Sequence, residues 1–342
     1  MPKLQMARPH PNLPALFAQA LKTFESSDST FRVLCSLRSS SAAPANLLAE
    51  PPRRPPKHIL VLDSSFNPPT LAHHRMVTSA LSDPRYKASV SQDKVVSDPE
   101  RLPDMRATSR VLLLLAINNA DKAPKPASFP QRLAMMYVFA QGILAEWAQR
   151  DISQSNTQAD AAYEAVDIAV TTEPYFHAKA QAIAKSDFYY GAREWGQSDS
   201  AAAGDTIIES DQVYLTGYDT IIRIFNPKYY PNNTMKASLD PFFAYARLRV
   251  TMRTDDAWGD AAKQVSYLDE LRAGALEAAG GRVEWIDKIE MVQGRRDDEA
   301  IISSTKVRDA VNNKDWGALK ELVGEGVVTW IRDNGLYTTE GQ

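Results

Sequence analysis

The stretch HILVLDSSFNPPTLAHHRM, residues 58–76, decides the fold. Its first six residues, 58–63, are an apolar run that predicts a buried strand, and two prolines after the following polar turn prevent its continuation. Thr70 has the side chain of a helix N-cap, so residues 70–81 are expected to form a helix. A strand, a tight turn and a helix in this order form the repeating unit of α/β sheets.

The same alternation continues to the end of the chain. Further buried strands are expected at residues 110–117, 166–171, 212–216, 248–253 and 283–292, with helices at 129–149, 175–188, 259–279 and over much of 304–335. Strands separated by helices predict an α/β fold, a Rossmann-like parallel sheet with helices on both faces. Ligands of such sheets bind outside the carboxyl ends of the strands, so the functional residues should directly follow strands.

The N-terminal part of the chain has a different composition. Residues 13–24 carry a helical apolar stripe, residues 31–37 suit a short strand, and residues 38–57 are rich in Ser, Ala and Pro. We therefore expect residues 1–57 to form an N-terminal helical arm with a Pro-rich linker, and residues 58–342 to form the ligand-binding domain. Polar stretches without periodicity, at 82–106 and 190–206, predict surface insertions.

The composition excludes several classes of protein. The 342 residues are 44% hydrophobic and 24% charged, a balance that excludes global disorder. The net charge of −3 does not suit a sequence-independent nucleic-acid binder, and the single cysteine, Cys35, cannot form a disulfide framework. No apolar run is long enough to span a membrane, and the first residues lack the apolar core of a secretory signal. We expect a cytoplasmic or nuclear location, or both, without nucleic-acid or membrane partners.

The turn and helix start at residues 63–76 form the first candidate site. Thr70 and His73 are three residues apart, so they share a face at the helix N-terminus, where unpaired N–H groups and a partial positive charge favour phosphate. His74 points about 100° away. The alternatives are an ordinary turn with a structural histidine, or a metal site. The metal site is the weaker one because the adjacent histidines diverge, and no metal ligand is predicted.

The second candidate site is IISSTKVR, residues 301–308. Ser303 or Ser304 can cap the following helix, and Ser304 and Arg308 are four apart on one helical face. A guanidinium there can hold phosphate oxygens with two hydrogen bonds, while Lys306 either adds charge or points to solvent. The alternative is an ordinary capped helix with solvated charges.

The third candidate site is LTGYDTIIRIF, residues 215–225. Gly217 follows a buried strand and permits close approach of a ligand to the backbone. The Asp219 carboxylate can accept hydrogen bonds from two sugar hydroxyls. The alternative is a tight turn in which Asp219 caps the next helix.

These three sites, in this order, resemble those of the nucleotidyltransferase superfamily, and most closely of nicotinamide mononucleotide adenylyltransferases. That family carries G-x-F-x-P-x-T-x-x-H, G-x-D and I-S-S-T-x-x-R. The matching residues are Ser65, Phe66, Asn67, Pro68, Thr70 and His73, then Gly217 and Asp219, then Ile302, Ser303, Ser304, Thr305 and Arg308. Residues 117–122 are similar to the family's lysine-bearing loop and 328–337 to its C-terminal helix. The arm and the polar insertions look like those of a divergent fungal branch.

The resemblance implies an enzyme that transfers AMP from ATP, with Mg²⁺, to nicotinamide mononucleotide (NMN), giving NAD and pyrophosphate. It implies that His73, Thr70 and Arg308 act on the phosphates in catalysis. Nucleotide binding would involve Ser65, Phe66, Lys122, Gly217, Asp219, Ser303, Ser304, Thr305 and Lys306, and the acceptor side Tyr175, Phe176 and Arg253. Residues 58–342 would then be the nucleotidyltransferase domain.

Two departures from the family pattern leave alternatives open. Ser64 stands at the family's opening glycine, and near Lys179 the threonine expected on the acceptor side is absent. The alternatives are nucleotidyl transfer to another phosphorylated acceptor, weak ATP hydrolysis, or a nucleotide-binding interaction protein without catalysis.

Overall fold

The computed structural model describes residues 12–38, 47–53, 55–86, 109–118, 127–154, 163–190, 211–253, 258–294 and 299–338. Lys122 and nearly all of the two expected insertions lie outside these ranges.

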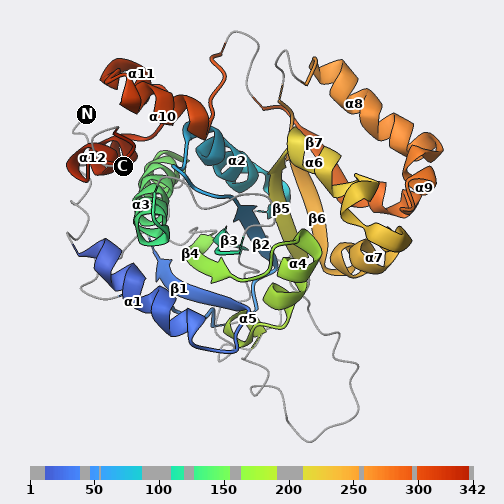
Figure 1. Cartoon of the computed structure of the whole chain (residues 1–342), viewed down its shortest axis with the longest axis horizontal. Coiled ribbons are helices and arrows are strands. Elements are labelled where there is room, and N and C mark those ends of the chain that lie inside the picture. Colours follow the sequence, from blue (N-terminus) through green and yellow to red (C-terminus); the bar gives the residue numbers. More distant parts are fainter. Residues whose placement is uncertain are drawn as a thin grey trace, which may run out of the picture.

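A seven-stranded sheet forms the centre of the fold (Figure 1). Its order is β1-β4-β3-β2-β5-β6-β7. The strands are β1 (Phe31–Leu37), β2 (His58–Asp63), β3 (Ser109–Ala116), β4 (Tyr163–Thr171), β5 (Asp211–Gly217), β6 (Ala246–Thr251) and β7 (Ile289–Val292). Neighbouring strands are parallel except β1, which runs antiparallel to β4. The expected α/β fold with a Rossmann-like parallel sheet is confirmed.

Helices cover both faces of the sheet (Figure 1). One face carries α1 (Leu13–Glu25), α2 (Leu71–Ser82), α3 (Phe129–Gln154), α10 (Ser304–Asn312), α11 (Trp316–Lys320) and α12 (Glu325–Asp333). The other carries α4 (Phe176–Ala184), α5 (Asp187–Tyr190), α6 (Tyr218–Ile224), α7 (Met235–Tyr245), α8 (Ala261–Glu270) and α9 (Leu276–Ala278). Consecutive residues of β2, such as Leu60 and Val61, pack into opposite layers, so the strand is apolar throughout. No helix in the described part of the chain is long and apolar enough to cross a membrane.

The structure differs from the expected arm at α1 and β1. The helix and the strand form where expected, but β1 pairs with β4 and closes one edge of the sheet. The apolar stripe of α1, including Phe17 and Phe24, is buried in the same core as α3. Sequence composition missed this because the contact is long-range: Ser36 on β1 and Asp167 on β4 are 131 residues apart. These two elements belong to the core of the domain.

Two other segments differ from the expectation. Val283–Lys288 forms a 3₁₀ helix, and only the last four residues of the expected strand form β7. Trp285 and Ile286 are adjacent and both buried, which the wound conformation allows. The second is α7, a helix that the sequence did not predict and that contains Pro241, a residue disfavoured in helix interiors.

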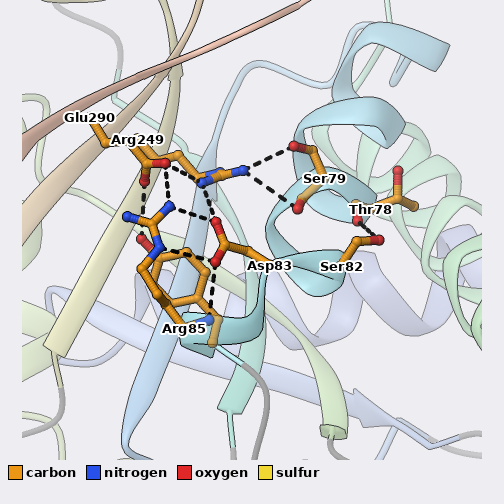
Figure 2. Close-up of polar contacts among 8 residues, drawn as sticks. Thr78, Ser79, Ser82, Asp83, Arg85, Arg249 and Glu290 are labelled. Atoms are coloured by element: carbon orange, nitrogen blue, oxygen red, sulfur yellow. Dashed lines mark hydrogen bonds and ion pairs between the residues drawn. The ribbon is translucent and has the colours of Figure 1, made fainter.

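A cluster of charged side chains holds the C-terminal end of α2 (Figure 2). The buried guanidinium of Arg249 on β6 donates to Asp83 at 2.9 Å, to Glu290 at 2.8 Å and to the Ser79 hydroxyl at 3.0 Å. Arg85 pairs with the same two carboxylates. Because α2 begins at the first candidate site, this cluster fixes the other end of the helix that carries that site.

Candidate active site

A cavity of about 260 Å³ lies at the carboxyl ends of β2, β5 and β6. The last residues of these strands, Asp63, Gly217 and Thr251, all line it. It also brings together residues from the predicted sites, namely Thr70, His73, Asp219 and Arg253. The cavity is therefore where the fold class places ligands.

The first loop fixes the imidazole of His73 at both ring nitrogens. Thr70 caps α2 and accepts from the backbone N–H of His73, while the Thr70 N–H donates to Nδ1 at 3.0 Å. The Thr70 hydroxyl lies 2.9 Å from the same nitrogen. On the opposite side of the ring, Nε2 lies 3.0 Å from Ser64 Oγ. Since Nδ1 accepts a backbone N–H, the neutral ring carries its proton on Nε2.

Burial lowers the pKa of His73 to about 4, so the ring is an uncharged donor at neutral pH. We expect its ring nitrogens, followed by NMR, not to titrate between about pH 5.5 and 8 in the folded protein. In the unfolded chain the pKa returns to about 6.5, so the unfolded state binds more protons below that value. The contribution of His73 to stability is complete above about pH 6.5 and is lost as the pH falls towards 4. A midpoint near 6.5 in the folded protein would contradict this assignment.

The second loop lies against the first. Ser303 caps α10 and accepts from the N–H of Lys306 at 3.2 Å. The Ser304 hydroxyl donates to the Pro68 carbonyl at 2.8 Å, and Arg308 Nη1 donates to the Asn67 carbonyl at 2.9 Å. The second guanidinium nitrogen of Arg308, Nη2, donates to Thr305 Oγ1 at 3.0 Å. The N-termini of α2 and α10, distant in sequence, are thus joined at one place. Of the second loop, Ala300, Ile301 and Ile302 line the cavity.

Gly217 and Asp219 form one unit at the end of β5. A Cβ on Gly217 would lie 2.8 Å from Asp219 Oδ1, so the glycine makes room for that carboxylate. Asp219 is in the first turn of α6, 3.9 Å from Arg223, and makes no side-chain cap on that helix. The tight-turn alternative, in which Asp219 caps α6, therefore does not describe the turn.

Of the other predicted residues, Arg253 lines the cavity, whereas Ser65, Phe66, Tyr175 and Phe176 do not. Ser65 is exposed, whereas Phe66 is fully buried with its ring 5.7 Å from that of His73 and a positive φ of 45°. Tyr175 is exposed and stacks on His177, and Phe176 lies beneath Lys179 and beside a buried tyrosine of β5. The expected aromatic pair at the acceptor side is thus split, with only Phe176 facing the core. Arg253, expected on the acceptor side, shares the cavity with Gly217 and Asp219.

The sequence did not identify three features of the cavity wall. Asp63 forms an ion pair with the buried Lys179 at 2.6 Å. Thr216 is 6% exposed, and its hydroxyl has no hydrogen-bond partner among the described residues. A Cβ on Gly294 would lie 2.1 Å from the Met252 carbonyl, so only glycine fits there. A polar residue at the end of an apolar strand is a sequence signal for a cavity-lining side chain, and Asp63 and Thr216 both have it.

His74 turns away from the cavity, as expected, and its Nε2 lies 3.1 Å from Glu146 of α3. Within the described ranges, no group of three or more His, Cys, Asp or Glu side chains is arranged to hold a metal ion.

Comparisons with known proteins agree with the motifs. No protein-family model matches the chain. It is 28% identical over 282 residues to the Schizosaccharomyces pombe protein named "Putative nicotinamide mononucleotide adenylyltransferase", across 81% of this chain and 84% of that protein.

Two solved structures are similar only distantly. The Plasmodium falciparum nicotinic acid mononucleotide adenylyltransferase complexed with NaAD aligns with a TM-score of 0.38 at 12% identity, over 82% of this chain and 97% of that one. Thermotoga maritima TmcAL bound with alpha-thio ATP aligns with a TM-score of 0.32 at 11% identity, over 81% and 56%. By its motifs and its sequence relative, the chain is an adenylyltransferase-like enzyme and resembles the nicotinamide mononucleotide adenylyltransferases of the nucleotidyltransferase superfamily.

Proposed function

We propose that the protein transfers AMP from ATP to NMN and so forms NAD and pyrophosphate. The observation that carries the proposal is the junction of two helix N-termini, where Ser304 and Arg308 bind the loop that positions His73. Each N-terminus carries a partial positive charge, which favours phosphate oxygens. The sequence relationship to the S. pombe protein supports the choice of acceptor.

The transfer needs no side-chain nucleophile. An oxygen of the acceptor's phosphate forms a bond to the α-phosphorus of ATP. The bond from that phosphorus to the bridging oxygen breaks, and pyrophosphate leaves with the electron pair. Mg²⁺ enters with ATP as part of the substrate. The protein contributes position and electrostatic stabilisation, as in other phosphoryl and nucleotidyl transfers.

Each predicted side chain then has a definite task. With ATP bound, the Thr70 hydroxyl turns from Nδ1 of His73, which keeps the backbone N–H of Thr70, to an α-phosphoryl oxygen, and the Nε2–H of His73 also donates to the α-phosphoryl group as charge develops there. Arg308 uses one N–H on the Asn67 carbonyl and another on the Thr305 hydroxyl, and its remaining N–H groups are available to the β- and γ-phosphates together with the N-terminus of α10. Asp219 accepts from the ribose hydroxyls.

Replacing Asp219 with alanine should raise the KM for ATP about 10-fold or more and change kcat little, because a ribose contact is made equally before and during the reaction. Gly217→Ala should act in the same direction, since the new methyl group displaces the Asp219 carboxylate. Initial rates at varied ATP concentration measure both effects. An unchanged KM for ATP in Asp219→Ala would remove this residue from the nucleotide site.

The direct test of the function is NAD formation by the purified full chain with ATP, Mg²⁺ and NMN. A panel in which nicotinate mononucleotide, other phosphorylated acceptors or water replaces NMN, and CTP replaces ATP, tests specificity. A clear preference for NMN and ATP supports the proposal. A preference for another acceptor would overturn the acceptor half alone. ATP binding without turnover on any acceptor would favour a nucleotide-binding protein.

A further inference from the structure

Ser64 lines the cavity beside His73, and the proposed function gives its side chain no role. It directly follows β2 and lines the cavity, and its backbone N–H donates to the Leu114 carbonyl of β3 at 3.3 Å. Its Oγ lies 3.0 Å from Nε2 of His73. The side chain therefore stands between the sheet and the imidazole, at the face where the proposed function places the α-phosphate.

The direction of the Ser64–His73 hydrogen bond follows from the other ring nitrogen. Nδ1 accepts the Thr70 N–H, so the neutral ring donates from Nε2 and Ser64 Oγ accepts. The hydroxyl proton of Ser64 then remains to be donated. Among the described residues, Ser64 Oγ makes no other hydrogen bond, so that proton has no protein acceptor there.

We propose that Ser64 is a further catalytic residue, whose hydroxyl donates a hydrogen bond to an α-phosphoryl oxygen of the bound nucleotide beside His73. This inference rests on the proposed function. Neither residue gives up its proton: the Nε2–H of His73 is shared between Ser64 Oγ and an α-phosphoryl oxygen, and the Ser64 hydroxyl, polarised by the imidazole, donates its own hydrogen bond to the phosphoryl group. A hydroxyl on this side chain supplies a donor that a glycine at the same place lacks.

The first test compares Ser64→Ala and Ser64→Gly with the wild type. Losing one preorganised donor should lower kcat with ATP and NMN about 10²-fold, and the dissociation constant of ATP should rise by up to about 10-fold. Ser64→Thr, which keeps the hydroxyl, should recover most of both. Ser82→Ala is the matched control, because this serine is exposed at the far end of α2, where its hydroxyl donates to the Thr78 carbonyl of the same helix.

The second test identifies the atom that Ser64 contacts. Sulfur accepts hydrogen bonds poorly, so the two α-thio diastereomers of ATP each remove one α-phosphoryl oxygen as an acceptor. The rate penalty of Ser64→Ala should stay near 10²-fold for one diastereomer and shrink to a few-fold for the other. Equal penalties with ATP and with both diastereomers would overturn the contact.

ATP binding, measured by calorimetry without any acceptor, separates this inference from the proposed function. If the wild type binds ATP more tightly than Ser64→Ala but makes no NAD, the acceptor is wrong and the Ser64 contact stands. If Ser64→Gly binds ATP as tightly as the wild type and turns over as fast, the Ser64 hydroxyl makes no hydrogen bond that matters to the bound nucleotide, and the inference fails. It fails equally if the wild type binds no ATP.

Discussion

Replacing His73 with alanine should lower pyrophosphate release from ATP and NMN about 10²–10³-fold, while the protein stays folded. The reason is electrostatic. The Nε2–H of His73 lies in a cavity next to the N-terminus of α2, and its position is fixed by hydrogen bonds at both ring nitrogens. A donor fixed in this way needs no reorganisation when charge develops on the α-phosphoryl oxygens, and removing one such donor typically costs about 3–4 kcal/mol of transition-state stabilisation.

The neighbouring histidine provides the matched control for this prediction. His74 has the same chemistry and the same helix but pairs with Glu146, so His74→Ala should keep nearly wild-type turnover. Loss of the His73 side chain opens the hydrogen bonds at the cap of α2, which should reduce the free energy of unfolding by about 1 kcal/mol, measurable by urea denaturation. Wild-type pyrophosphate release by a folded His73→Ala protein would remove this residue from catalysis.

The sequence predicted the parts of the site that depend on interactions between residues close together in the chain. Thr70 and Ser303 are N-caps whose side chains accept hydrogen bonds from the first turn of their own helices, so three or four residues of sequence contain the whole interaction. The strands β2 and β3 are apolar on both faces, which identifies central parallel strands. Since parallel strands end at a common edge, the loops after β2 and β5 were expected to meet, and both line the cavity.

Long-range contacts account for what the sequence did not predict. The sequence around Lys179 does not indicate its ion pair with Asp63, which lies 116 residues earlier in the chain. The requirement for glycine at 294 depends on the Met252 carbonyl of another loop. The edge position of β1 depends on β4, far along the chain. Each of these becomes visible only when two distant segments are placed together.

A buried ion pair gives the largest stability prediction. Arg110 on β3 and Asp167 on β4 are both 0% exposed at their side chains, and Arg110 Nη2 lies 2.7 Å from Asp167 Oδ1. Asp167 also accepts from the hydroxyls of Ser36 on β1, at 2.6 Å, and Tyr189 on α5, at 2.9 Å. Arg110 donates to the Glu50 carbonyl at 3.0 Å as well. The pair therefore ties the N-terminal segment to the centre of the sheet.

Replacing Arg110 with methionine should lower the free energy of unfolding by about 3–5 kcal/mol near pH 7, because Asp167 stays buried without its cation. Burial already raises the pKa of Asp167, and loss of Arg110 should raise it further. An acid whose pKa is higher in the folded state loses stability as the pH rises, so the deficit should be smallest near pH 4–5 and should grow towards neutrality. Adding Asp167→Asn, which keeps an acceptor for Ser36 and Tyr189 without the charge, should recover part of the loss in urea denaturation. If the free energy of unfolding of Arg110→Met stayed within about 1 kcal/mol of the wild-type value at every pH, Asp167 would not need this cation.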